Sequence, residues 1–77
     1  MDNMIKKLIS MCNDYIPYIV DSEGYEEPYT WTNLLSSDML NQITGEEAEQ
    51  FARKPMSRKI WLRCGNDDIC FKKIKKM

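Results

Sequence analysis

The residues of this sequence that are best suited to chemistry are its three cysteines, Cys12, Cys64 and Cys70. A thiolate nucleophile needs a neighbouring base, and the chain contains no histidine, which is the commonest general base. In the C-terminal hairpin described below, Cys70 is expected to face Arg63, which lowers a thiol pKa but accepts no proton. The cysteines form no CxxC pair, so we predict no metal site. Because three is an odd number, full pairing within one chain is impossible, and reduced thiols predict a cytoplasmic location.

Other catalytic signatures are missing from the sequence. The 12 Asp and Glu residues fall where helix caps, turns and exposed faces are expected, and their spacing singles out no acid–base pair. Neither GxxxxGK[ST] nor GxGxxG occurs, so no phosphate-binding loop is indicated. We therefore predict a protein that is not an enzyme, with no catalytic residues and no cofactor.

The most informative feature is the distribution of charge along the chain. Residues 1–50 hold ten acidic and two basic side chains, a balance of −8, whereas residues 51–77 hold nine basic and two acidic ones, a balance of +7. These two balances sum to the net charge of −1. The sequence thus predicts a molecule with two oppositely charged regions, which suits recognition of another macromolecule.

The acidic region alternates carboxylates with aromatic side chains. Tyrosine and tryptophan are enriched at the anchoring centres of protein interfaces, and carboxylates around them steer a basic partner. We predict a protein-binding surface that consists of Tyr18, Asp21, Glu23, Tyr25, Glu26, Glu27, Tyr29 and Trp31. The alternative is that most of these rings complete a small core, which would still leave one or two of them exposed for contact.

The basic region supports a second hypothesis, because basic side chains beside an exposed aromatic ring can neutralise phosphates and stack on bases. The candidate nucleic-acid-binding residues are Arg58, Lys59, Trp61, Arg63, Lys72, Lys73, Lys75 and Lys76. In the competing interpretation, the lysines keep a sheet edge from pairing with other molecules, and Trp61 makes a cross-strand cation–π contact. A pI near 5.3 and the lack of a known binding motif favour the competing interpretation.

The periodicity of apolar residues predicts an N-terminal helix within residues 3–16 that ends near residues 14–15, because Pro17 disfavours helical geometry before it. Its buried face is expected to consist of Ile5, Leu8, Ile9, Cys12 and Ile16. From Thr32 the pattern indicates one helix or two short helical turns, with Thr32 or Ser37 as caps. A further helix over residues 45–54 follows from the capping box formed by Thr44 and Glu47. It should bury Ala48, Phe51 and Ala52.

Two hairpins complete the predicted elements. Residues 17–31 carry two β-prone runs around a turn at 21–24, and Pro28 suits an edge strand. Residues 58–76 form the second hairpin. With Asn66 and Asp67 in its turn, the expected pairs are Cys64 with Ile69, Leu62 with Phe71, Ile60 with Lys73, Arg63 with Cys70, Trp61 with Lys72 and Lys59 with Ile74. This register points Cys64 inward and Cys70 outward.

These elements predict one small two-layer α+β domain spanning residues 1–77, with an N-terminal helix, central helices and antiparallel strands that end in a C-terminal β-hairpin. Its apolar stretches are too short for a membrane span or a signal peptide, so we expect no membrane association. We expect a small protein-binding regulator or inhibitor, similar in size and surface to phage or mobile-element products that block host enzymes. Nucleic-acid binding is the alternative, and the oligomeric state stays open because oppositely charged regions also permit self-association.

Overall fold

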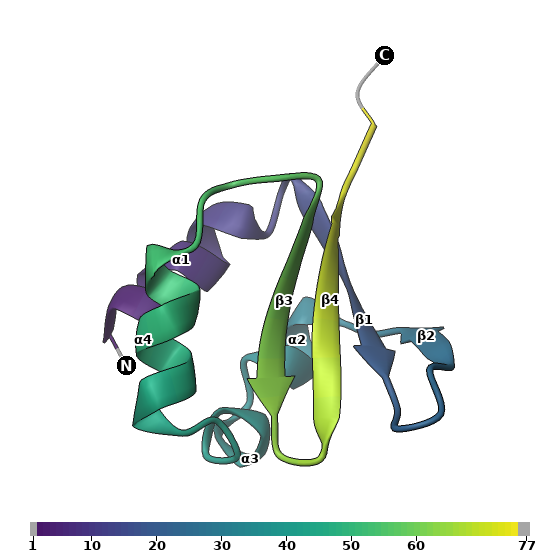
Figure 1. The fold of residues 1–77 in the computed structure, drawn as a ribbon. Helices are drawn as coiled ribbons and strands as arrows, with labels where there is room; N and C mark the ends of the chain where they lie inside the picture. Colours follow the sequence, from purple (N-terminus) through teal and green to yellow (C-terminus); the bar gives the residue numbers. More distant parts are fainter. Residues whose placement is uncertain (1, 76–77) are drawn as a thin grey trace.

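The fold is known from a computed structural model that describes residues 2–75, so Lys76 lies outside the described residues. The predicted α+β class is confirmed (Figure 1). The elements in chain order are α1 (Asp2–Met11), β1 (Tyr15–Val20), β2 (Glu26–Pro28), α2 (Trp31–Leu34), α3 (Ser37–Leu40), α4 (Gly45–Arg53), β3 (Lys59–Cys64) and β4 (Asp67–Lys73). None of the helices in this described range combines the length and the apolar character that crossing a membrane requires.

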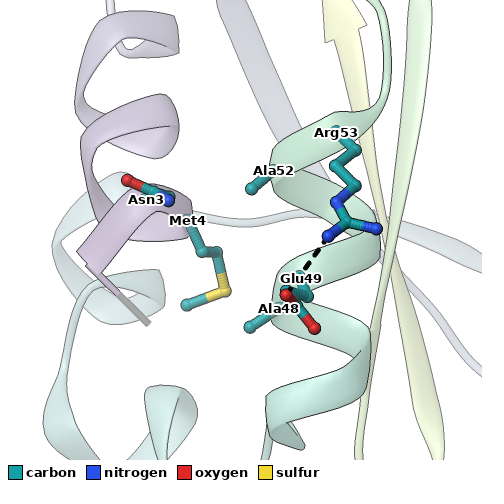
Figure 2. A pocket seen from close by; sticks show the side chains of 6 residues that line it. All are labelled: Asn3, Met4, Ala48, Glu49, Ala52 and Arg53. Carbon is teal, nitrogen blue, oxygen red and sulfur yellow. Dashed lines mark hydrogen bonds and ion pairs between the residues drawn. The ribbon is translucent and has the colours of Figure 1, made fainter.

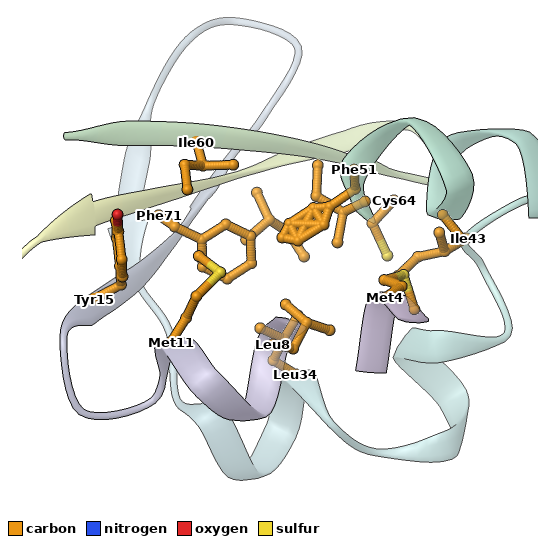
Figure 3. Packing of buried hydrophobic residues seen from close by; sticks show 13 residues of the cluster. Met4, Leu8, Met11, Tyr15, Leu34, Ile43, Phe51, Ile60, Cys64 and Phe71 are labelled. Atoms are coloured by element: carbon orange, nitrogen blue, oxygen red, sulfur yellow. The ribbon is translucent and has the colours of Figure 1, made fainter. Parts of the chain in front are cut away.

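The four strands form one antiparallel sheet in the order β2-β1-β4-β3. The helices supply side chains to a buried cluster on one face of this sheet (Figure 3). At its centre, the ring of Phe71 lies 5.4 Å from that of Trp31 and 5.6 Å from that of Phe51. The cluster consists of Met4, Leu8, Met11, Tyr15, Leu34, Ile43, Ala48, Phe51, Ile60, Leu62, Cys64, Ile69 and Phe71. The other face of the sheet is open, and its Ile16 and Trp61 are each 40% exposed.

The buried face of α1 differs from the predicted one. The side chains that enter the core are those of Met4, Leu8 and Met11, whereas Ile9 is 59% exposed. Two other predicted members, Cys12 and Ile16, lie beyond the end of the helix, and Ile5 is only partly buried. The spacing of the methionines is as compatible with a helical stripe as that of the isoleucines, so contacts with α4 decide the rotation of α1.

Lys7 connects α1 to the end of α4. Its ammonium donates hydrogen bonds to the carbonyl oxygens of Phe51, at 2.7 Å, and of Lys54, and lies 4.8 Å from the centre of the Phe51 ring. A cation on the last carbonyls of α4 stabilises that helix end. Partial burial, together with the charge of Lys54, lowers the pKa of Lys7.

The helix α4 forms as predicted. The Thr44 hydroxyl accepts a hydrogen bond from the backbone N–H of Glu47 at 3.2 Å, and Ala48 and Phe51 are buried, whereas Ala52 is only partly buried. The preceding region contains two short helices, α2 and α3, which is one of the two predicted alternatives. Their N-caps are Thr30 and Ser36, each one or two residues before the predicted caps.

The β3–β4 hairpin confirms the predicted faces but not the predicted pairs. Its two-residue turn is Gly65–Asn66, and Gly65 has φ +62°. A type II′ turn requires positive φ at its first central residue only, which glycine adopts without strain. Each pair is therefore shifted by two positions, and the observed pairs are Lys59–Lys72, Ile60–Phe71, Trp61–Cys70, Leu62–Ile69, Arg63–Asp68 and Cys64–Asp67. A two-residue shift keeps every side chain on its expected face.

The β1–β2 hairpin is also present, and β2 is an edge strand as expected from Pro28. Pro17 is instead inside β1, which has neighbours on both sides. The Pro17 carbonyl accepts a hydrogen bond from Tyr29 N–H at 2.9 Å, just past the last β1–β2 pair. The Pro17 nitrogen faces the same side, so the β1–β4 ladder loses no hydrogen bond.

Candidate functional site

Part of each charged region of the sequence lies at an opposite end of the sheet. The loop between β1 and β2 and the turn between β3 and β4 are at one end, and β4 leaves the sheet at the other (Figure 1). We call the first the acidic end; its carboxylates belong to Asp21, Glu23, Glu26, Glu27, Asp67 and Asp68. We call the second the basic end; its cations belong to Arg58, Lys59, Lys73 and Lys75. Two side chains have a charge opposite to that of their end: Asp14 lies at the basic end, and Arg63 lies at the acidic end.

Five residues of the acidic end form one exposed surface, which we call the acidic hairpin surface. They are Asp21, Glu23, Tyr25, Glu26 and Glu27. The Tyr25 side chain is the most exposed large apolar group of the described residues, at 68%. Within residues 2–75, Glu26 is the only one of its carboxylates that forms an ion pair. The surface therefore presents an aromatic ring surrounded by largely uncompensated negative charge.

The loop that carries this surface is held by its own hydrogen bonds. One oxygen of the Asp21 carboxylate accepts from the backbone N–H groups of Glu23, at 2.9 Å, and Tyr25, at 3.0 Å. The Asp21 backbone also bonds to Gly24 N–H and to the Tyr25 carbonyl. Gly24 has φ +89°, which a side chain would oppose. Asp21 is thus a positioning residue for the loop as well as part of its charge.

The other aromatic residues of the predicted protein-binding set do not belong to this surface, although Tyr18 and Glu26 share a contact with Lys72. Trp31 packs against Phe71, and its indole N–H donates to the Tyr15 carbonyl at 3.0 Å. Tyr29 is likewise partly buried against the core. Tyr18 lies on the open face of the sheet, two strands from Trp61. Tyr25 is therefore the one ring of the predicted set that joins the exposed carboxylates.

A single ion pair connects the acidic hairpin to the basic residues of β4. The Lys72 ammonium lies 2.7 Å from a Glu26 carboxylate oxygen and 4.6 Å from the centre of the Tyr18 ring. The hydrogen bond with Lys72 lowers the pKa of Glu26, and the same bond raises the pKa of Lys72. The sequence predicted a cation–π contact of Lys72 with Trp61, but the β1–β4 pairing supplies Tyr18 instead.

Cys70 occupies the centre of the open face, as its register predicts, but its side chain is not accessible. It is paired with Tyr18 on one side and Trp61 on the other and is 0% exposed. Burial raises the pKa of the Cys70 thiol, and it also raises that of Cys64, whose thiol contacts the Met39 carbonyl. All three cysteines are free thiols. Both buried thiols therefore stay protonated at neutral pH.

The basic end holds part of the predicted nucleic-acid-binding set. Arg58, Lys73 and Lys75 line a hollow of about 330 Å³ together with Ile74. Backbone hydrogen bonds from Lys73 N–H to the Arg58 carbonyl and from Ile74 N–H to the Asp14 carbonyl, both 2.8 Å, fix its walls. Arg63 is not in this group, because it lies at the acidic end, 3.7 Å from Asp68.

Another hollow, of about 230 Å³, lies between α1 and α4 (Figure 2). Its apolar floor includes Met4 and Ala48, and the exposed ion pair between Glu49 and Arg53, at 3.4 Å, lies at its rim. Across residues 2–75, the Cys, Asp and Glu side chains form no group of three that could hold a metal ion. The described residues thus offer two charged ends and several hollows at the surface where another molecule could bind.

Sequence reasoning missed the juxtaposition of Tyr18 and Trp61 on one face, since it depends on the pairing of β1 with β4. Comparison of the chain with known protein families, curated proteins and solved structures finds no match. Functional inference therefore rests on the geometry of these surfaces.

Proposed function

We propose that the protein acts as a regulator or inhibitor by binding a basic surface of another protein through the acidic hairpin surface. The observation that supports this most is the 68% exposed Tyr25, which lies in the sequence between Asp21 and Glu23 on one side and Glu26 and Glu27 on the other. Aromatic anchors supply much of the binding energy of protein interfaces, while surrounding charges raise the association rate and select the partner.

The rigidity of the loop supports the same function. The two N–H groups bound by Asp21 and the backbone bonds of Gly24 and Tyr25 hold the loop in one shape before binding. A surface that is already ordered loses less conformational entropy when a partner docks on it. The partner is expected to present lysine and arginine side chains around an apolar hollow that accepts the tyrosine ring.

The structure also decides which carboxylates are informative to mutate. Glu26 pairs with Lys72, and Asp21 holds the loop, so substitutions at either residue remove a structural contact as well as a charge. Glu23 and Glu27 are exposed and make no ion pair among the described residues. Their loss removes charge from the surface with little effect on stability.

The test begins with affinity capture of the partner from the native cell. Tyr25→Ala should then weaken binding by about 5- to 30-fold, which corresponds to about 1–2 kcal/mol for an interface anchor. The double variant Glu23→Gln/Glu27→Gln should weaken binding mainly at low salt and through slower association. The control Asp2→Asn/Glu46→Gln makes the same charge change on α1 and α4, at exposed residues without an ion pair in the described structure, and should bind normally. Unchanged capture by the Tyr25 and Glu23/Glu27 variants would contradict the proposal.

A further inference from the structure

The open face of the sheet, which the proposed function does not use, carries the second exposed aromatic ring. Trp61 on β3 lies in the same row as Cys70 on β4 and Tyr18 on β1. Because neighbouring strands are about 4.8 Å apart, the backbones of Tyr18 and Trp61 lie about 10 Å apart, and both side chains are on the same face of the sheet. The buried Cys70 between them makes the centre of this row apolar.

A hollow borders the Trp61 ring at the edge of the sheet. It measures about 210 Å³ and is lined by Lys54, Pro55, Ser57, Lys59, Ile60 and Trp61. Trp61 therefore lines an open hollow together with two lysines. The hollow keeps its shape because Lys54 donates to the Trp61 carbonyl at 2.6 Å and Ser57 donates to the Lys59 carbonyl at 2.8 Å.

Positive charge continues from Trp61 toward the basic end. Lys59 is two residues before Trp61 on the same strand and face, and it pairs with Lys72. Beyond them lies the 330 Å³ hollow with Arg58, Lys73 and Lys75. Of the residues that line these two hollows within 2–75, none is a carboxylate. An extended anionic chain would thus meet cations along its length and a flat apolar ring at one point.

We infer that this face binds single-stranded nucleic acid, with one base stacked on Trp61 and phosphates at Lys59 and at the hollow of Arg58, Lys73 and Lys75. An exposed aromatic ring beside cations is how sequence-tolerant single-strand binding is built, since every base has a stacking face and every nucleotide a phosphate. Bases in a duplex are already stacked on each other, so the ring selects single strands. An acidic peptide would satisfy the cations but has no planar group for the indole.

The ion pair between Glu26 and Lys72 restrains this activity. It neutralises one cation of the face and holds that cation over Tyr18, at 4.6 Å from the ring centre. Glu26→Gln releases Lys72 and should tighten nucleic-acid binding. In the proposed function, the same substitution removes attraction for a basic protein partner and weakens binding. Opposite signs for one variant make the two hypotheses separately testable.

The experiment measures fluorescence anisotropy of labelled single strands of DNA and RNA about 12 nucleotides long, within the span of small single-strand-binding domains. Binding at low ionic strength should weaken as salt rises. Trp61→Ala should reduce affinity by about 5- to 150-fold, as expected for loss of one base stack, and Trp61→Phe should restore most of it. Lys59→Gln should weaken binding and reduce the log–log salt slope by about 0.7. Lys6→Gln, a charge-matched change on α1, should have no effect.

Absence of binding at low ionic strength would overturn the inference. So would binding that Trp61→Ala leaves unchanged, in variants that far-ultraviolet circular dichroism shows to be folded, or equal displacement of the strand by oligoglutamate and by unlabelled strand. Each of these results would mean that the open face attracts nucleic acid only through nonspecific charge, or that it does not bind nucleic acid.

Discussion

The two ends of the sheet carry opposite charge and are built differently. At the acidic end, carboxylates project from a loop that Asp21 holds by hydrogen bonds to Glu23 and Tyr25. At the basic end, cations project from strand ends and line a hollow. The chain just before it is held by Tyr15, which donates a hydrogen bond to the Ser57 carbonyl at 2.7 Å. The difference shows how a chain with a net charge of only −1 can present two separate surfaces of opposite charge.

The largest expected effect comes from the strand that joins the two ends. Phe71 is fully buried in the middle of β4, between the rings of Trp31 and Phe51. Phe71→Ala should lower the free energy of unfolding by about 3–5 kcal/mol, because it removes buried apolar surface and leaves a cavity. Urea unfolding followed by fluorescence and by circular dichroism would measure it. A loss below about 1 kcal/mol would show that the ends do not share one core.

Removal of the positioning group at the acidic end should have a smaller and local effect. Asp21→Ala deletes the acceptor of two backbone N–H groups and should cost about 1–2 kcal/mol. Amide hydrogen exchange should accelerate at Glu23 and Tyr25 but not at Lys73 or Ile74. Glu23→Ala is the control, since that side chain holds no backbone group in the described structure. Equal acceleration at both ends would contradict the view that each end is fixed independently.

The matching change at the basic end is Tyr15→Phe. It removes only the hydroxyl that bonds to the Ser57 carbonyl, so the expected loss of stability is about 1 kcal/mol. Amide hydrogen exchange should accelerate in the segment before β3 and should not change in the loop at residues 21–25. A variant as stable as the natural protein, with unchanged exchange in that segment, would show that this hydrogen bond does not hold the basic end.

The smallest effect concerns the ion pair between the two charged regions, and it depends on pH. Because the folded pKa of Glu26 is lowered, its contribution to stability is present above its unfolded value of 4.5 and is lost as pH falls through the folded pKa. Lys72, with a raised pKa, contributes below 10.5 and loses this contribution as pH rises through its folded value. The stability difference between the natural protein and Glu26→Gln should therefore be constant near neutral pH and shrink toward both extremes. A stability difference that does not vary with pH would show that Glu26 and Lys72 do not form a stabilising ion pair.

Elements with local signals were predictable from the sequence. The capping box at Thr44 places α4, and Pro28 places an edge strand. The turn of the C-terminal hairpin also carries a local signal. Gly65 before Asn66 favours a type II′ turn, whereas the predicted turn started at Asn66 and shifted the pairs by two residues.

Features that depend on contacts between distant residues were not predictable. The rotation of α1 is set by contacts with α4, which favour Met4 and Met11 over Ile9 as core residues. The pairing of β1 with β4 places Tyr18 beside Cys70 and brings Lys72 to Glu26. No local pattern indicates which strand lies next to the C-terminal hairpin, so the open face with two aromatic rings emerges only from the fold.

The proposed function requires that the acidic end is a separate and accessible surface for a basic partner. Its most direct test is nuclear magnetic resonance of the ¹⁵N-labelled protein during titration with a short oligolysine peptide at low ionic strength. We predict saturable shifts of the backbone amides of residues 21–27, with Tyr25 among the largest, and unchanged amides at Arg58, Lys73 and Lys75. Shifts spread evenly over both ends, or no shifts at all, would contradict the account.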